Sequence, residues 1–420
     1  MSESETKDKP NSDVADFIEW VKVNKINLIL VIPIFILFIT AFLSFTNRAQ
    51  WILNILLFTF VLFIGALSLD LEVGSVGLPN FGKVAFFALG AYISSLTYTA
   101  GVPLPIGVAF ALIVCGFFGF IIAIPTVKLR ADYFAIMTIA GAEVIRFLLQ
   151  NEERYFYFKG TPLISNSIKT DFVALFNGKI EIFETLGLGI VRQWHILLVI
   201  IFALISLFVY WIVEEIRKSP YGRTLRAIRE DDITVTSVGK NVYRFRWQVT
   251  TFAGVLAGLA GVMYGIVLAA FEHGDFRPFL TFELFVFIII GGLGNSRGVF
   301  AGVLLVQVYI RAAQADIIKK GISLRLFPEM DIFGDLFNWL QLDIIINPDN
   351  TRLIILGTIL ILFLLFKPQG LIPEPRTNNS KYLNLVPEEV KKRSDDAIKA
   401  RQSLTEKARL TGEELDETGE

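Results

Sequence analysis

The chain has 420 residues, of which 54% are hydrophobic and only 19% are charged, and its mean hydropathy is +0.58. Soluble globular domains carry about a quarter of charged residues, so this composition excludes a soluble protein, and the many apolar runs exclude an enzyme with a single membrane anchor. The 39 Lys and Arg residues balance the 40 Asp and Glu residues and are spread over short segments, so the charge gives no reason to expect a nucleic-acid partner.

The apolar runs predict an all-α protein embedded in the lipid bilayer. A helix that spans a bilayer needs about 20 apolar residues. Two apolar segments, 73–96 and 282–310, are interrupted by glycine. Together with the uninterrupted runs, they predict a polytopic membrane helix bundle of roughly 8 to 10 transmembrane segments with broken helices. The uninterrupted spans are predicted at 26–45, 51–69, 104–124, 133–149, 195–213, 247–269 and 353–366.

The two ends of the chain differ from this apolar middle. Residues 1–25 are polar and acidic and no cleavage pattern follows them, so we interpret them as a retained N-terminal tail. The transmembrane domain is predicted over 26–366. Residues 367–420 are rich in charge and poor in apolar side chains, which predicts a C-terminal tail of solvated helix or disorder.

The first broken segment, 73–96, contains the sequence Gly77-Leu78-Pro79-Asn80, followed by Gly82. An unpaired backbone amide in hydrocarbon costs several kcal/mol, so a broken helix at membrane depth needs protein or a water-filled cavity around it. Such breaks tend to mark a transport path. The glycines could instead serve only to let helices pack closely.

The 133–149 helix carries two opposite charges. Glu143 and Arg146 are three positions apart, so they share a face and can pair. Charges inside spans usually have a function, which favours a polar lining of a path or a proton relay. A charge pair that fixes two helices is an equal alternative.

The orientation follows from the short loops. The 214–246 loop has eight cations against five acids, so the excess of Lys and Arg predicts that it is cytoplasmic. The 150–194 loop is balanced and is expected outside. Counting spans from these loops places both termini in the cytoplasm of a cell-membrane protein. A cytoplasmic C-terminus also requires that 282–310 returns to the side it entered from, or crosses twice.

The 214–246 loop predicts a short helix, because Ser219 is a good cap and Pro220 suits the first helical position. Leu225 and Ile228 fall on one side of it and several arginines on another, while Gly239 is placed to end the helix that follows. Such a helix suits docking into a groove of a partner protein, and it suits the anionic surface of the membrane equally well. The residues assigned to this docking loop are Ser219, Pro220, Gly222, Arg223, Arg226, Ala227, Ile228, Arg229, Glu230 and Asp231.

Two later apolar segments, 247–269 and 282–310, carry glycine for different reasons. In 247–269 the glycines recur every three or four residues, which is the small-residue stripe of a helix that packs closely on its neighbours. In 282–310 the sequence Gly292-Leu293-Gly294-Asn295 resembles the break in 73–96. Paired broken helices in two halves of a transporter indicate a substrate path between them. The residues assigned to this path are Gly77, Asn80, Gly82, Tyr133, Thr138, Glu143, Gly291, Gly292, Gly294 and Asn295.

The sequence offers no catalytic or metal-binding constellation. The histidines are His195 and His273, and Cys115 is the single cysteine. No phosphate-binding G-x-x-x-x-G-K-[ST] loop occurs; Gly82-Lys83, for example, is followed by valine. We expect no catalytic residue, no metal and no cofactor in this chain.

Several stretches resemble one family, the LivM-type permeases of branched-chain amino acid ABC importers. The cytoplasmic loop SPYGRTLRAIREDDITVTSVGKNVYRFRW is similar to the family's signature loop. Four further stretches match in order: GLPNFGKVAFFALGAY, KLRADYFAIMTIAGAEVIRF, ELFVFIIIGGLGNSRGVFAGVLL and FKPQGLI. The chain departs from the family at 80–83, where Asn-Phe-Gly-Lys replaces the usual Ser-Leu-Gly-His, and at Val299, where proline is usual. The 311–350 segment and the charged tail also look longer than usual.

The resemblance implies a permease subunit that translocates branched-chain or related amino acids. It implies ABC ATPase subunits that hold ATP and Mg and contact the cytoplasmic loop, a second homologous permease subunit, and an extracytoplasmic binding protein that delivers the cargo. A permease of the same family for urea or a short amide is an alternative. An ion-coupled secondary transporter that uses Glu143 and Arg146 is another, and it would need no ATPase.

Overall fold

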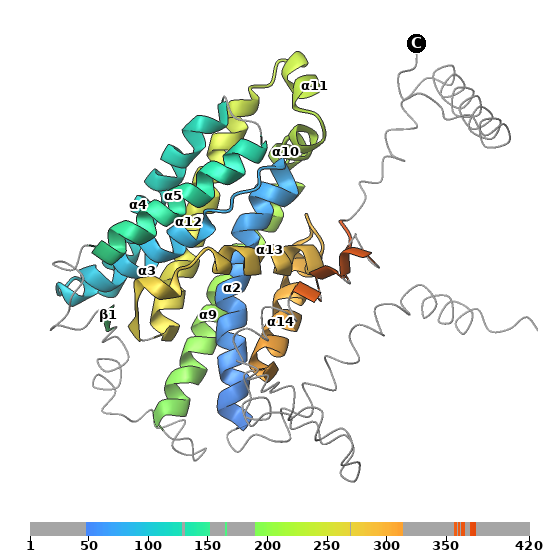
Figure 1. Ribbon diagram of the computed structural model, residues 1–420. Coiled ribbons are helices and arrows are strands. Elements are labelled where there is room, and N and C mark those ends of the chain that lie inside the picture. The colour runs from blue at the N-terminus through green and yellow to red at the C-terminus, as the bar shows by residue number, and fades with distance from the viewer. Residues whose placement is uncertain are drawn as a thin grey trace, which may run out of the picture. The chain divides into compact units, whose positions relative to one another are not determined.

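A computed structural model describes residues 48–127, 131–151, 164–165, 190–268, 270–313, 357–358, 360–361, 363–365 and 370–374. The predictions for 1–25, the 26–45 span, most of the 150–194 loop, the 314–350 segment and the tail beyond 374 lie outside these residues. The described part is almost entirely helical (Figure 1).

The longer helices are α2 (Arg48–Val76), α3 (Lys83–Thr99), α4 (Leu104–Ala123), α5 (Ala131–Asn151), α9 (Ile190–Lys218), α12 (Val242–Leu268), α13 (Phe279–Gly291) and α14 (Ser296–Ala313). The shorter helices are η1 (Ile124–Val127), α10 (Pro220–Glu230), α11 (Asp232–Ser237) and η2 (His273–Asp275). Two short strands, β1 (Ile164–Ser165) and β2 (Ala270–Phe271), pair antiparallel with Ile164 opposite Phe271.

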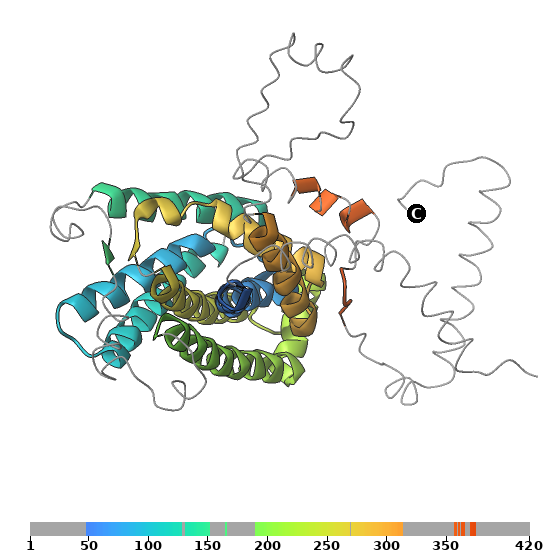
Figure 2. The same ribbon diagram turned by 90° about the horizontal axis from the view of Figure 1, so that it is seen from below.

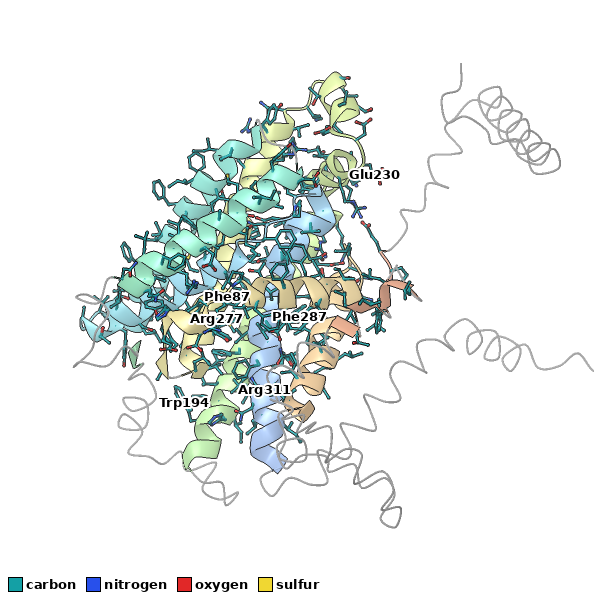
Figure 3. The ribbon with its side chains drawn as sticks, in the orientation of Figure 1. Phe87, Trp194, Glu230, Arg277, Phe287 and Arg311 are labelled. Atoms are coloured by element: carbon teal, nitrogen blue, oxygen red, sulfur yellow. The ribbon has the colours of Figure 1, made fainter. Side chains whose placement is uncertain are left out.

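Helix α2 lies at the centre of the bundle. Seen along its axis, it is surrounded by α9, α12 and α14 (Figure 2). Its side chains between Val61 and Leu71 are buried on all sides, which explains why the sequence is apolar all round instead of on one face. Phe87 of α3 and Phe287 of α13 lie in the same core and are fully buried (Figure 3).

Helix α12 packs against α2, α3 and α4 through its glycines. A Cβ atom built on Gly258 would lie 2.5 Å from Cys115 Sγ of α4. One built on Gly261 would overlap the backbone of Phe87. The predicted role of this small-residue stripe in packing is therefore confirmed.

The first break lies in the predicted stretch that begins at Gly77, but the helix before it is longer than predicted. Helix α2 does not end at Leu69 but continues to Val76, because the acids that follow Leu69 are buried beside cations from elsewhere in the chain. The chain then leaves the helix at Gly77, which has a φ of 76°, and α3 begins at Lys83.

The second break separates α13 from α14, whose axes are bent by 118°. Because this angle exceeds a right angle, α14 runs partly back along the direction of α13 (Figure 1). This is the geometry of a broken span or of a re-entrant loop, so the return of 282–310 to the side it entered from, or its crossing twice, stays a prediction.

Four described helices, α2, α4, α9 and α12, are long and apolar enough to cross a membrane, and the bent α13–α14 pair adds a fifth if it counts as one span. Exposed large apolar side chains on α4 and α9, such as Ile113 and Leu204, are those expected of surfaces that face lipid or another subunit. The chain is a multi-pass membrane protein.

Candidate functional site

Two buried ion pairs lie where α2 approaches the first break. The Asp70 carboxylate accepts from Arg217 of α9 at 2.5 Å, and the Glu72 carboxylate lies 3.0 Å from the Lys83 ammonium. Asp70, Glu72 and Lys83 are fully buried. A buried charge is tolerated only with such a partner, so these pairs fix the end of α2 to α9 and α3.

The side chains around the first break supply the hydrogen bonds that the interrupted helix loses. Asn80 accepts from the Gly82 amide at 2.9 Å and donates to Glu72 at 3.3 Å. The Phe81 amide donates to the Thr138 hydroxyl of α5, and the Val84 amide donates to the Thr281 hydroxyl of α13. The broken backbone is therefore satisfied by protein, as it must be at membrane depth.

The second break is a turn with two residues at positive φ, Gly292 at 114° and Gly294 at 77°. Asn295 then accepts from the amides of Arg297 and Gly298 and so caps the start of α14. Gly291 has no room for a side chain because the backbone of Gly298 lies against it.

The two breaks meet at Asp70. One oxygen of this carboxylate accepts from the Gly294 amide at 2.9 Å while the other accepts from Arg217. A Cβ atom on Gly74 would lie 2.7 Å from the Gly294 nitrogen, so the end of α2 touches the second turn directly.

The structure thus brings most of the predicted path residues to this region and leaves two elsewhere. Thr138 lies on the buried side of α5 and reaches the first break, whereas Tyr133 lies on its exposed side. Glu143 pairs with Arg146 at 2.7 Å on the same helix, with half-buried side chains. The residues at or beside the breaks are Gly77, Asn80, Gly82, Thr138, Gly291, Gly292, Gly294 and Asn295.

Helix α10 lies at the same end of the bundle as the breaks (Figure 1). It begins as predicted: Ser219 accepts from the Gly222 amide at 3.3 Å and Pro220 is the first helical residue. Asp231 caps α11 through the amides of Ile233 and Thr234. The Thr234 hydroxyl also donates to its carboxylate, and this bond, followed by the amide bonds, holds the pKa of Asp231 below the usual range. Gly239, at a φ of 81°, follows the end of α11, also as predicted.

The inner side of α10 is fixed to the bundle. Leu225 and Ile228 are buried, and burial raises the pKa of the Tyr221 phenol to about 12, so it stays protonated and donates to Gln248 of α12. Arg226 donates to the Arg217 carbonyl, and Arg229 donates to the Gly74 carbonyl at the end of α2.

The outer side of α10 is exposed along one face, at Arg223, Ala227 and Glu230. Glu230 lies at the edge of the bundle in Figure 3. This surface continues at α11 with two apolar side chains, Ile233 within the helix at 76% exposure and Val238 just after its end at 74% exposure. Exposed apolar side chains of this size beside charges are typical of a protein-binding surface.

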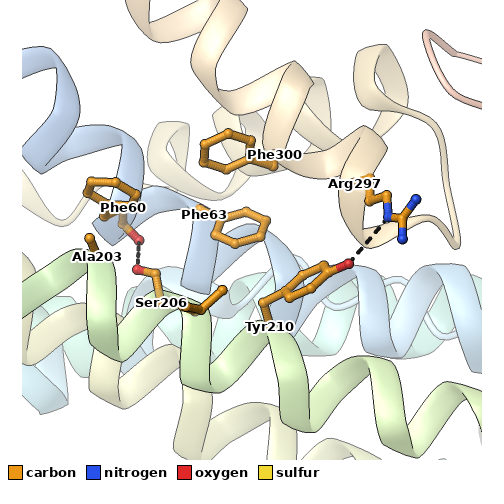
Figure 4. Close-up of a pocket in the computed structure, with 8 residues that line it drawn as sticks. Phe60, Phe63, Ala203, Ser206, Tyr210, Arg297 and Phe300 are labelled. Atoms are coloured by element: carbon orange, nitrogen blue, oxygen red, sulfur yellow. Dashed lines mark hydrogen bonds between the residues drawn. The ribbon is translucent and has the colours of Figure 1, made fainter.

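An apolar groove of 410 Å³ lies between α2, α9 and α14 (Figure 4). The Tyr210 hydroxyl of α9 accepts from Arg297 of α14 at 3.4 Å at one end of it. The lining residues include one cation and no acid, so the groove does not offer the two opposite charges that the ammonium and carboxylate of an amino acid need. The lining residues are Phe60, Phe63, Ala203, Ser206, Leu207, Tyr210, Arg297 and Phe300.

The sequence reasoning missed several polar residues of this region. The sequence could have indicated Asp70 and Glu72, because these two acids directly follow an apolar run and acids within a membrane need partners. Lys83 entered the sequence analysis in the search for a phosphate-binding loop and in the resemblance, but not as the partner of a buried acid. Glu374, which lies beside α10, follows the last predicted span, and no sequence pattern indicated that it contacts α10. Among the described residues, no three His, Cys, Asp or Glu side chains form a group that could hold a metal ion.

Comparison with known proteins gives a family and several relatives. The model of the branched-chain amino acid transport system / permease component family matches residues 51–364. The probable branched-chain amino acid transport permease protein LivM of Methanocaldococcus jannaschii is 28% identical over 365 residues, which cover 76% of this chain and 92% of that protein. The high-affinity branched-chain amino acid transport system permease protein LivM of Escherichia coli is 25% identical, over 76% of this chain and 69% of that protein.

A third relative has a different name. The nucleoside ABC transporter permease protein NupC of Lactococcus lactis is 28% identical over 255 residues, which cover 51% of this chain and 75% of that protein. No solved structure matches the chain.

Proposed function

Because this chain belongs to the branched-chain amino acid transport system / permease component family, we propose that it carries a branched-chain amino acid across the cell membrane as one permease subunit of an ATP-driven ABC importer. The chain itself is a transport permease subunit with no catalytic activity of its own. ATP and Mg are held by separate ATPase subunits, a binding protein delivers the cargo outside, and a second homologous permease completes the path. The 26–366 region is the membrane domain, and both tails are cytoplasmic.

The surface of α10 and α11 supports this assignment. A helix whose inner side is tied to the bundle can transmit force, and its free outer face of Arg223, Ala227 and Glu230 can dock in a groove of the ATPase. In this proposal Arg226 and Arg229, which bond to the bundle, hold the helix in place, and the exposed Arg223 and Ala227 contact the partner.

The test is co-purification with the ATPase followed by uptake of labelled leucine in proteoliposomes. Ala227→Arg places a large charge on the docking face and should abolish both. Ala100→Arg, an exposed alanine in the turn between α3 and α4, is the matched control and should change neither. Normal co-purification and uptake with Ala227→Arg would move the docking site to another loop.

We also propose that the two breaks line the cargo path. Their contact at Asp70 and the concentration of buried charge around them support this. Cysteines at Asn80 and Asn295, in a Cys115→Ala background, should react with a small water-soluble thiol reagent in at least one nucleotide state. Failure of both to react in every state would place the path elsewhere.

A second cargo class is favoured by the similarity to NupC, a nucleoside permease. The two classes are separated by direct uptake: labelled leucine should accumulate in the proteoliposomes, whereas labelled uridine should not. The reverse result would make a nucleoside the cargo.

A further inference from the structure

The short segment 370–374, which we call the strap, lies across the turn between α13 and α14. The Leu371 amide donates to the Ile290 carbonyl at 2.8 Å, and the Ile372 amide donates to the Gly291 carbonyl at 3.0 Å. These bonds satisfy carbonyls at the end of α13 that have no partner within the helix. The Asn295 side chain donates to the Pro373 carbonyl at 3.0 Å, so the strap is bound on both sides of the turn.

The last residue of the strap joins this turn to α10. The Glu374 carboxylate accepts from Arg229 at 2.8 Å and lies 3.7 Å from Arg226. It also fills the space beside Gly294, where a Cβ atom would lie 3.0 Å from the Glu374 carboxyl carbon. One side chain therefore touches the helix that faces the proposed ATPase and the turn of the second break.

Arg229 extends the connection to the first break. One terminal nitrogen of its guanidinium donates to the Gly74 carbonyl, and the other donates to Glu374. The planar guanidinium holds both partners in a fixed geometry, which a flexible ammonium would not do.

The exposure of these residues argues against a role in stability alone. The Arg229 and Glu374 side chains are each 26% exposed, and an ion pair with this much access to water contributes little to folding. What the pair fixes is the position of α10 relative to the turn.

We propose that Glu374 is a positioning residue that transmits movement of α10 to the turn between α13 and α14. The proposal rests on the proposed function, in which an ATPase moves α10. Without the Glu374 carboxylate, α10 remains attached through Leu225, Ile228 and the Gly74 bond, but its link to the second break is lost.

The test measures cargo transported per ATP hydrolysed in the assembled complex. Glu374→Gln keeps the shape of the side chain and removes its charge. It should leave co-purification with the ATPase and basal ATP hydrolysis near wild type, while cargo per ATP falls about tenfold, the scale of a typical coupling between two sites. Arg229→Glu should lower cargo per ATP at least as far, because it also removes the bond to the Gly74 carbonyl, and Arg229→Glu combined with Glu374→Arg should restore the part of the loss that is due to the ion pair.

A second readout separates positioning from a merely structural role. Leu293→Cys, at an exposed position of the turn in a Cys115→Ala background, should change its rate of labelling by a water-soluble maleimide when ATP and vanadate are added. Glu374→Gln should abolish this change without altering the amount of protein in the membrane. Lys218→Gln is the control, since the Lys218–Glu214 pair lies at the same end of the bundle without touching the strap.

The outcomes are distinct. If wild type binds its ATPase and imports cargo while Glu374→Gln keeps a normal cargo-to-ATP ratio and a normal labelling response, Glu374 has no positioning role. If Glu374→Gln fails to accumulate in the membrane, the double variant Arg229→Glu with Glu374→Arg decides. The proposal is overturned if this double variant accumulates normally but its ratio of cargo transported to ATP hydrolysed stays low. If wild type itself neither binds an ATPase nor uses ATP, the proposed function fails first.

Discussion

Lys83 is a full positive charge at a fully buried position, at the start of a helix whose partial charge is also positive. It is tolerated because Glu72 lies 3.0 Å away, and Asn80 then connects Glu72 to the Gly82 amide. Asn80 and Lys83 therefore form one local arrangement, in which both contact the Glu72 carboxylate.

For the Lys83–Glu72 pair, we expect one single substitution to lower the free energy of unfolding more than the double substitution does. Lys83→Met leaves a buried, uncompensated carboxylate and should destabilise the protein by about 3 to 5 kcal/mol. Combining it with Glu72→Gln should recover most of that loss, because no charge remains to be buried. Thermal unfolding of the detergent-solubilised chain gives the three values.

The Glu143–Arg146 pair is the matched comparison. Its side chains are 29% and 19% exposed, so Arg146→Gln should cost only about 0.2 to 1 kcal/mol. Equal losses of unfolding free energy on breaking the two pairs would show that Lys83 and Glu72 are not buried in the membrane. A proton relay through Glu143 would add a pH dependence of uptake that disappears in Glu143→Gln.

At the scale of the helices, close contact between α3, α4 and α12 depends on the absence of side chains. Gly261 and Gly258 of α12 lie against backbone or Cβ atoms that cannot move independently of their own helices. Any added atom must therefore separate two helices over their whole length.

Gly261→Ala is accordingly expected to destabilise the bundle by about 1 to 3 kcal/mol, the usual cost of overpacking. Gly141→Ala is the control: Gly141 lies within α5 with no atom near its would-be Cβ, and alanine favours the helix. The yield of folded protein after extraction, and its unfolding temperature, should fall for the first variant only. A Gly261→Ala protein as stable as Gly141→Ala would mean that α12 can shift away from α3 freely.

The same elements show what the sequence could and could not predict. The start of α10 at Pro220 and the turn at Gly239 depend on local chemistry and were predicted correctly. The orientation of Arg229 was not, since it is set by Gly74 and Glu374, which are 155 and 145 residues away along the chain. The ends of α2 were misjudged for the same reason: the partners that allow Asp70 and Glu72 inside a helix bundle are invisible to a hydropathy window.

For the whole molecule, the exposed surfaces imply how the chain sits in a membrane. The exposed apolar side chains of α4 and α9 belong to long apolar helices, whereas Ile233 belongs to the six-residue helix α11 and Val238 directly follows it, both beside charged residues. The first group is expected in hydrocarbon and the second in water.

Cysteine labelling in a Cys115→Ala background checks this. Ile233→Cys should react readily with a water-soluble maleimide, whereas Ile113→Cys and Leu204→Cys should not, although both are more than 60% exposed in the isolated chain. A spin label at Ile113 or Leu204 should be quenched by a lipid-soluble relaxing agent if lipid covers it, and protected if the second permease does. Rapid aqueous labelling at all three sites would contradict the bilayer placement.

The Asp70–Arg217 pair also has a consequence for biosynthesis. The two residues are 147 positions apart, so α2 enters the membrane carrying an acid whose partner has not yet been made. At the usual rate of about 5 to 20 residues per second, the ribosome needs roughly 7 to 30 seconds to reach Arg217. During that interval α2 has to remain beside the insertion machinery, near water. In nascent chains that stop before α9, α2 should therefore be easily extracted from the membrane. In chains that include Arg217, α2 should resist extraction.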